Sequence, residues 1–271
     1  MKTRIIAAAV LVPVLFLVVL VAPKEVAAAI MGALQAIAAY ELLYRTKLVT
    51  KPRLVVYSVV MAFAIALWSF ADAIHAYFVL MVLAYFLLMF SEMMRDHVKI
   101  RFETLSMCFV GGLVVPYLMS AVVRILTMSI GRYVILIPFV VACICDAGAY
   151  FIGLKFGKHK LAPVVSPNKT IEGVIGGLAG AMTGMLIYAL ILDLGFKFEV
   201  NYGLALLYGL VGSGVGTFGD LCFSIIKRQT GIKDYGNLIP GHGGVLDRFD
   251  SLSMVAPLME ALLLLLPLIQ M

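Results

Sequence analysis

The sequence predicts an all-α fold, a polytopic bundle of transmembrane helices. Of its 271 residues, 63% are hydrophobic and only 13% are charged, and the mean hydropathy is +1.07. Soluble domains usually contain about 45–50% apolar and about 25% charged residues. Because a chain of this composition cannot cover a water-facing surface, lipid must be its main solvent.

Apolar runs of the length that crosses a bilayer as a helix, about 20 residues, recur along the whole chain. The first run follows Lys2 and Arg4, as in a signal peptide, but its length and the spans after it favour a retained membrane helix. We expect nine spans, at roughly 5–22, 26–44, 54–71, 73–91, 104–126, 133–154, 171–194, 203–226 and 250–270.

The positions of lysine and arginine predict the orientation. With the N-terminus in the cytoplasm, the alternating connections place 17 of these residues on the cytoplasmic side and four on the opposite side. An excess of this kind is the positive-inside pattern. The two longest polar connections, about 155–170 and 227–249, then face the cytoplasm, where nucleotides are available.

The two longest polar connections both lie in the second half of the chain, which predicts two regions. Residues 1–130 form membrane helices for packing and lipid contact, and residues 131–271 form a C-terminal domain with a cytoplasmic site. Spans seven and eight carry small residues at four-residue spacing, as in Gly173, Gly177 and Ala181. Such stripes let helices approach closely. We expect a homodimer, although the stripes serve packing within one chain equally well.

Carboxylates within or beside the spans are the first candidates for function, because an ionised side chain near the membrane centre costs a few kcal/mol or more. Asp146, Asp220, Asp247 and Asp250 lie near predicted cytoplasmic helix ends. Carboxylates that converge repel one another unless a cation neutralises them. Oxygen ligands suit Mg²⁺ or a similar hard divalent ion, with room for a second cation. Internal ion pairs are the alternative.

Helical spacing groups these acids with other polar residues. Asp220, Ser224 and Lys227 share one stripe of span eight, and Asp247 and Asp250 would share a face where span nine begins. We rank two further acids, Glu41 and Glu260, lower, because they have no neighbouring polar cluster in the sequence.

The connection between spans eight and nine is rich in glycine. Gly241, Gly243 and Gly244 flank His242, so the backbone can adopt positive φ and present amide N–H groups to an anion. Glycines, cations and carboxylates in one short segment are typical of a phosphate–metal site. The cations that bracket this connection are Lys227, Arg228, Lys233 and Arg248.

A second polar segment leads into span seven. It carries Ser166, Lys169, Thr170 and Glu172, at a point where helix N-terminal amides favour anions. A plain helix cap by Thr170 explains the segment equally well. No basic stripe interleaves with aromatic residues, so we expect no nucleic-acid partner.

The stretch from Ser224 to Asp250 resembles the signature of phosphatidate cytidylyltransferases, the CDP-diacylglycerol synthases. The runs that begin at Asp146 and Ser166 also resemble this family, but Asn168 stands where a second basic residue is expected. The resemblance is dense from about 140 to 255, and the first 130 residues match only in hydropathy. The matching residues are Ser224, Lys227, Arg228, Lys233, Asp234, Gly236, Pro240, His242, Gly243, Gly244, Asp247, Arg248 and Asp250.

The resemblance implies a reaction in which CTP and phosphatidic acid, a membrane lipid, give CDP-diacylglycerol and pyrophosphate for phospholipid synthesis. It places the enzyme in the inner cell membrane with its site facing the cytoplasm. It implies divalent-metal ligands at Asp146, Asp220, Asp247 and Asp250. It implies that phosphates are contacted by Lys169, Lys227, Arg228, Lys233 and Arg248. The backbone amides of Gly243 and Gly244 would also contact phosphates, and His242 would orient a phosphate or act as an acid. Further substrate contacts would come from Ser166, Thr170, Glu172, Ser224 and Asp234.

Two other functions fit part of the pattern. The first is a lipid kinase that uses CTP, because such an enzyme would have a related site on the cytoplasmic side. A cation-coupled transporter also carries buried acids, but the long charged connection and the lack of an evident inverted repeat argue against it.

Overall fold

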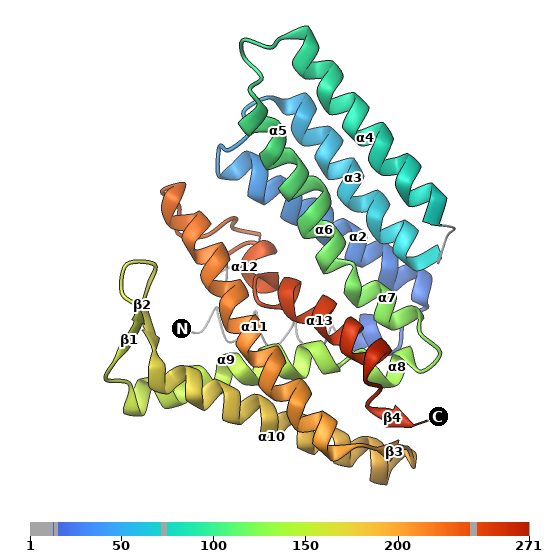
Figure 1. Ribbon diagram of the computed structural model, residues 1–271, viewed down its shortest axis with the longest axis vertical. Coiled ribbons are helices and arrows are strands. Elements are labelled where there is room, and N and C mark those ends of the chain that lie inside the picture. Colours follow the sequence, from blue (N-terminus) through green and yellow to red (C-terminus); the bar gives the residue numbers. More distant parts are fainter. Residues whose placement is uncertain (1–12, 14–15, 72–74, 239–242, 271) are drawn as a thin grey trace. The chain divides into compact units, whose positions relative to one another are not determined.

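The structure is a computed structural model that describes residues 13, 16–71, 75–238 and 243–270 (Figure 1). Helices dominate it, and a multi-pass helical membrane protein is confirmed at this level. In the described part of the chain, seven helices are long and apolar enough to cross a membrane: Lys24–Arg45, Pro52–Ala71, His75–Arg95, Phe102–Thr127, Gly131–Phe156, Ile171–Phe196 and Tyr202–Gln229.

These seven helices coincide with the second to eighth predicted spans. The first predicted span, 5–22, lies mainly outside the described residues. The ninth, 250–270, is shorter than predicted: helix α13 covers only Leu252–Leu265 and contains Pro257. Fourteen residues make a helix of about 21 Å, whereas the hydrocarbon core is about 30 Å thick.

The chain forms two compact units. Unit 1 comprises Met1–Ser129 and Gln229–Phe249, and unit 2 comprises Ile130–Arg228 and Asp250–Met271. The sequence assigned all residues after 130 to one C-terminal domain. In the structure the 229–249 segment instead groups with the N-terminal helices.

Unit 1 is a helical bundle in which α2 packs along α3. Gly111 and Gly112 lie close against Leu43, Ser58 and Tyr85, so the segment that carries them packs tightly on its neighbours. The elements of unit 1 are α2 (Lys24–Tyr40), the π-helical turn η1 (Glu41–Arg45), α3 (Pro52–Ala71), α4 (His75–Arg95), α5 (Phe102–Phe109), the π-helical turn η2 (Val110–Val114), α6 (Val115–Met119), α7 (Ala121–Thr127) and α12 (Leu246–Phe249).

The core of unit 1 is apolar, with one internal polar network. The Tyr85 hydroxyl lies 2.9 Å from the carbonyl oxygen of Cys108 and 2.8 Å from the Ser58 hydroxyl, which lies 2.8 Å from the carbonyl oxygen of Leu54. The two hydroxyl protons serve these three contacts. Each hydroxyl is satisfied, as buried polar groups must be. Around this network lie Leu43, Val49, Val55, Met61, Ile65, Met89, Ile100 and Leu105.

Unit 2 contains long helices and two small sheets that the all-α prediction omitted. A polar hairpin pairs β1 with β2 antiparallel, and β3 pairs antiparallel with β4. The apolar runs that dominate the sequence gave no signal for these short, mostly polar strands. The elements of unit 2 are α8 (Gly131–Val134), α9 (Ile137–Phe156), β1 (Lys160–Ala162), β2 (Ser166–Thr170), α10 (Ile171–Phe196), β3 (Glu199–Val200), α11 (Tyr202–Gln229, of which Gln229 belongs to unit 1), α13 and β4 (Ile269–Gln270).

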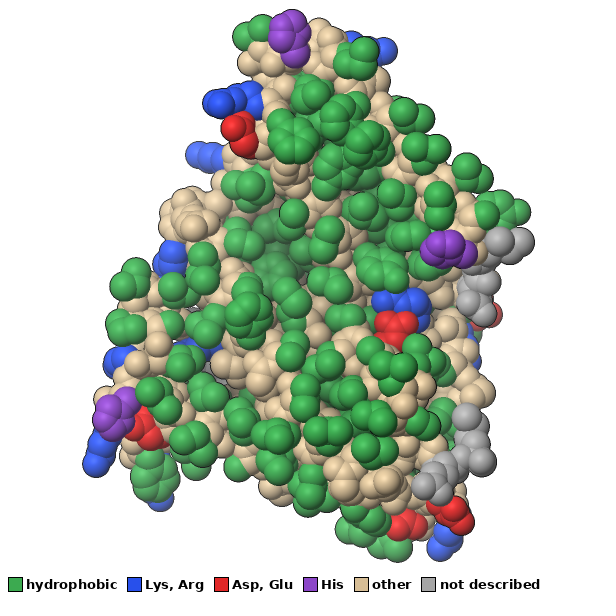
Figure 2. Space-filling view, in the orientation of Figure 1, with side chains coloured by type: hydrophobic (Ala, Val, Ile, Leu, Met, Phe, Trp, Pro, Cys, Tyr) green, Lys and Arg blue, Asp and Glu red, His purple; other side chains and the backbone are tan. Residues whose placement is uncertain are grey.

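Helices α9 and α10 run antiparallel and touch along their glycines. Gly148 faces the backbone of Gly176, and Gly177 faces Cys145. The small-residue stripe predicted from the sequence therefore serves packing within the chain. The homodimer stays a prediction. Figure 2 shows apolar side chains over much of the visible face, as expected for surfaces in contact with lipid.

Replacing Gly148 by alanine should destabilise unit 2. A methyl group at Gly148 would lie 2.7 Å from the carbonyl oxygen of Gly176, so the two backbones would have to separate. Overpacking of this kind typically costs about 1–3 kcal/mol. The measurement is the melting temperature in detergent, which should fall for Gly148→Ala. Gly214→Ala is the matched control, since no described heavy atom lies within 4 Å of the added methyl; an equal fall in both variants would contradict the packing.

Candidate active site

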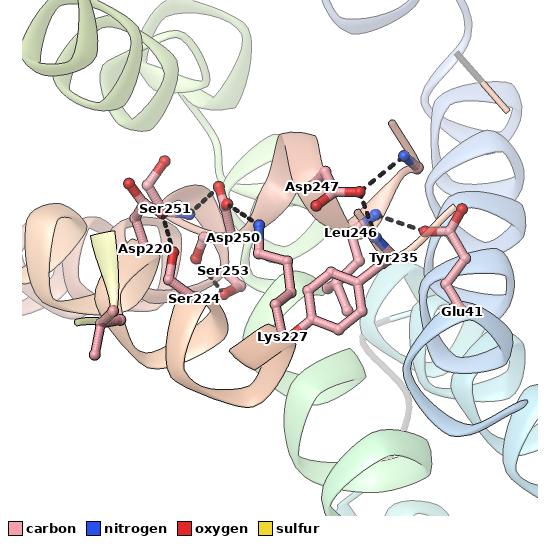
Figure 3. A network of polar contacts seen from close by, with 12 residues as sticks. Glu41, Asp220, Ser224, Lys227, Tyr235, Leu246, Asp247, Asp250, Ser251 and Ser253 are labelled. Carbon is pink, nitrogen blue, oxygen red and sulfur yellow. Dashed lines mark hydrogen bonds and ion pairs between the residues drawn. The ribbon is translucent and has the colours of Figure 1, made fainter. Parts of the chain in front are cut away.

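In unit 2, helix α11 carries two of the predicted site residues on one face. The Ser224 hydroxyl donates to Asp220 Oδ1 at 3.2 Å, so the predicted stripe is present (Figure 3). A glycine one residue before Asp220 permits close packing against the chain that enters α13: a methyl group at Gly219 would lie 3.2 Å from the carbonyl oxygen of Asp250. Small residues thus bring two predicted acids near each other.

Lys169 reaches the same face of α11 from the hairpin. Its Nζ lies 2.5 Å from Asp220 Oδ2, and both side chains are about one-quarter exposed. The next residue, Thr170, caps α10 by accepting a hydrogen bond from the Gly173 N–H at 3.1 Å. The helix-cap alternative is therefore confirmed for Thr170, while Lys169 belongs to the acidic cluster.

Asp250 occupies a turn between α12 and α13. Its Oδ1 accepts from the N–H of Ser251 at 2.8 Å, and its carbonyl accepts from the Ser253 hydroxyl at 2.9 Å. Lys227 Nζ lies 4.0 Å from Asp250 Oδ2. The predicted helix running continuously through Asp247 and Asp250 is wrong, because the chain turns at Asp250 before α13 begins.

Three carboxylates from separate elements of unit 2 act on one another electrostatically. Burial, and then the negative charges of Asp220 and Asp146, raise the pKa of Asp250 to about 7, although Lys227 opposes the shift. Asp146 comes from α9 and is exposed. We call Asp146, Asp220 and Asp250, with Lys169 and Lys227, the acidic cluster. Part of the ion-pair alternative holds, since Lys169 and Lys227 each pair with an aspartate.

The remaining predicted residues of unit 2 shape the hairpin. Glu172 accepts from the N–H of Lys158 at 3.1 Å and lies 2.6 Å from His159 Nδ1. Arg228 Nε donates to the carbonyl of Val165 at 3.1 Å, which ties the end of α11 to the hairpin. Ser166 pairs with the β1 strand.

In unit 1, Asp247 organises the 229–249 segment. Its Oδ2 accepts from the N–H of Tyr235 (2.7 Å) and of Gly244 (2.9 Å), and Asp247 is 5% exposed. Gly243 has φ +84°, the conformation expected of a glycine in this turn. The Gly244 amide, predicted to meet a phosphate, is thus directed at Asp247 in this structure.

The cations of the 229–249 segment point outward. Lys233 and Arg248 are exposed, so they are accessible to an anionic ligand, and the predicted substrate contact Asp234 beside Lys233 is exposed as well. The predicted residue His242 lies outside the described residues, as does Pro240 of the signature.

Glu41 is the site-related residue that the sequence ranked too low. It is 3% exposed and accepts hydrogen bonds from the N–H groups of Val245 (3.2 Å) and Leu246 (2.9 Å) (Figure 3). Its only sequence signal was a carboxylate at the end of an apolar run. The glycines that make room for it, Gly236 and Gly244, lie about 200 residues later.

The donor chemistry is compatible with a hard divalent cation. In the described part of the chain, no three or more histidine, cysteine, aspartate or glutamate side chains lie close enough to hold a metal ion by themselves. Mg²⁺ is usually bound through one or two carboxylates together with substrate phosphates. Asp220 and Asp250 meet that requirement. The pKa of Asp250 is raised by burial first and then by neighbouring negative charge, and a cation would offset that negative charge.

Comparison with known proteins identifies the family. The family model described as "Cytidylyltransferase family" matches residues 2–266. The chain belongs to the cytidylyltransferase family. This match includes the N-terminal helices, where the sequence resembled the family only in hydropathy.

Individual relatives of this cytidylyltransferase carry a more specific name. The phosphatidate cytidylyltransferase of Staphylococcus haemolyticus is 47% identical over 138 residues, which cover 51% of this chain and 52% of that protein. Proteins of the same name from Staphylococcus saprophyticus and Staphylococcus aureus are each 45% identical over the same shares of both chains. The chain spans about half the length of the curated relatives that it matches.

The raised pKa of Asp250 predicts a pH-dependent stability. The folded state holds the proton up to about pH 7, whereas the unfolded chain releases it near the ordinary value of 3.8. The contribution of Asp250 to the free energy of unfolding therefore falls as pH rises from about 4 to about 7 and is flat above that. With a chelator present, the melting temperature of the wild type should fall more between pH 5 and 7.5 than that of Asp250→Asn. An identical fall in the two proteins would refute the shift.

Proposed function

We propose that this chain transfers the cytidylyl group of CTP to phosphatidic acid, giving CDP-diacylglycerol and pyrophosphate for phospholipid biosynthesis. The family match and the names of the relatives support this reaction. The observation that carries it is the acidic cluster, in which Asp146, Asp220 and Asp250 come together and two of them pair with Lys169 and Lys227. Such a cluster suits two reactants that both bring phosphates.

The reaction is an in-line displacement at phosphorus. A phosphate oxygen of phosphatidic acid attacks the α-phosphorus of CTP, a new P–O bond forms, and the bond to the β-phosphate breaks as pyrophosphate leaves. The attacking oxygen is already anionic, so no strong general base is needed. The protein must align two anions and stabilise the charge on the departing pyrophosphate. The residues we assign to these phosphates are Lys169, Lys227, Arg228, Lys233 and Arg248.

We further propose that the reaction requires Mg²⁺ or a similar divalent ion, which a second cation can join. Within unit 2, Asp220 and Asp250 would hold it with Asp146 as a further ligand, and it would supply positive charge to the reacting phosphates. For Asp247 of unit 1, a metal-binding role is carried over from the family resemblance alone. Asp220 already meets a cation in the structure, the ammonium group of Lys169.

The proposed setting is the inner cell membrane, with the N-terminus and active site in the cytoplasm. The distribution of lysine and arginine supports the orientation. It places CTP and the headgroup of phosphatidic acid on the same side of the bilayer. A homodimer stays part of the proposal without support from the glycine stripes, which pack within the chain.

Labelled CTP tests the reaction directly. Purified protein, phosphatidic acid and Mg²⁺ are incubated with CTP labelled at the α- or the γ-phosphate. The α-label should enter the lipid product, and a chelator should abolish the transfer. Entry of the γ-label would identify a lipid kinase instead, and no entry of either label would refute both enzymes.

Variants connect this activity to the acidic cluster. Asp220→Asn should lower turnover by at least about 100-fold, since it weakens binding of the proposed cation, which supplies positive charge to the reacting phosphates. Glu260→Gln, a change to an acid of α13 outside the acidic cluster, is the control and should keep near-normal turnover. Comparable losses in the two variants would show that the cluster has been assigned wrongly.

A further inference from the structure

Glu41 is a buried carboxylate to which the proposed reaction assigns no role. It lies at the first position of the π-helical turn η1 and is 3% exposed. Burying a charged group without partners is costly. Its two oxygens take the backbone N–H groups of Val245 and Leu246 as partners, at 3.2 and 2.9 Å. A side chain of the N-terminal helices therefore anchors the backbone of the 229–249 segment.

The segment is built to receive this side chain. Methyl groups added at Gly236 or at Gly244 would overlap the Glu41 carboxylate. The two glycines lie on either side of the stretch that includes the undescribed residues 239–242. Both ends of that stretch thus rest against one carboxylate, and a larger residue at either end would displace it.

Gly244 connects Glu41 with Asp247. The N–H of Gly244 donates to Asp247 Oδ2 at 2.9 Å, while its Cα faces the Glu41 carboxylate. Two residues on, the N–H of Leu246 is held by Glu41. The backbone that fixes Asp247 is therefore itself fixed by Glu41, so movement at residue 41 must be transmitted to Asp247.

We propose that Glu41 is a positioning residue that holds residues 235–238 and 243–247 in the conformation in which Asp247 takes part in cytidylyl transfer. This inference rests on the proposed function. It gives a residue of the N-terminal helices a role in the reaction, where the sequence alone indicated only membrane spans. Glu41 touches backbone amides in this arrangement, and it acts on the reaction through the segment it holds.

Hydrogen exchange tests the anchoring without any assay of activity. Glu41→Ala removes both acceptors, so amide exchange in a peptide covering 243–249 should accelerate about tenfold or more. The matched control is Glu92→Ala in α4. Glu92 is also a buried acid of unit 1, at 8% exposed, but it bonds Tyr57 and Arg95 and leaves the segment untouched. Unchanged exchange in Glu41→Ala, or equal acceleration in Glu92→Ala, would overturn the proposal.

Kinetics test the positioning role. On the folded protein, Glu41→Ala should lower kcat about tenfold or more while the KM for CTP changes less than about twofold, because alignment and not nucleotide binding is lost. Glu41→Gln keeps the shape and one acceptor oxygen, so it should recover part of kcat. Glu92→Ala should keep kcat. Faster exchange at 243–249 with normal kcat in Glu41→Ala would overturn the positioning role.

A third comparison tests the contact itself. Gly236→Ala should lower the melting temperature in the wild type, where its methyl group would overlap the Glu41 carboxylate, and much less in Glu41→Ala, where that space is vacated. Equal losses in the two backgrounds would contradict the contact.

If the wild type transfers no cytidylyl group, the proposed function fails, whereas the exchange and melting experiments still decide whether Glu41 anchors the segment.

Discussion

Charge balance among acids on otherwise apolar helices is the constraint on which the site depends. Asp220 lies in a helix that is apolar enough to span a membrane, and an ionised group there needs a partner. Lys169 supplies one at 2.5 Å, from a hairpin that the sequence did not predict. The hairpin in turn is fastened to the end of α11 by Arg228. Much of the local structure of unit 2 therefore serves to bring a cation to Asp220.

The same requirement takes a different form in unit 1. Glu41 and Asp247 are both buried, and the contacts described above satisfy them with backbone N–H groups. Amide dipoles stabilise a carboxylate without cancelling its charge. The acids of unit 1 thus order the backbone through amide hydrogen bonds, whereas Asp220 and Asp250 of unit 2 are paired with lysine side chains that a phosphate or a cation can displace.

Hydropathy made most of the fold predictable. Seven helices match their predicted spans because each needs only a long apolar run, and in lipid such a run can satisfy its backbone only as a helix. The prediction failed where the pattern is polar or short. The strands around Lys160 and Ser166 carry no apolar periodicity. The final span is shortened at both ends, because the chain turns at Asp250 before α13 begins and the helix ends at Leu265.

The site was predictable to the extent that its chemistry is local in sequence. Ser224 and Asp220 are one helical turn apart, and their hydrogen bond follows from that spacing. The ion pair of Lys169 with Asp220 and the contact of Glu41 with Leu246 join residues far apart in the chain. Spacing carries no information on such pairs. The glycines that admit Glu41 have a meaning only once the tertiary structure is known.

Binding of Mn²⁺, followed by electron paramagnetic resonance in lipid nanodiscs with CTP present, tests the central claim most directly. In the wild type, the acidic cluster should bind Mn²⁺, so the signal of free Mn²⁺ should fall until one or a few ions are bound per protein chain. The Asp220→Asn variant should bind far less Mn²⁺. Equal binding by the two proteins, or no binding by the wild type, would contradict a cation held by these carboxylates.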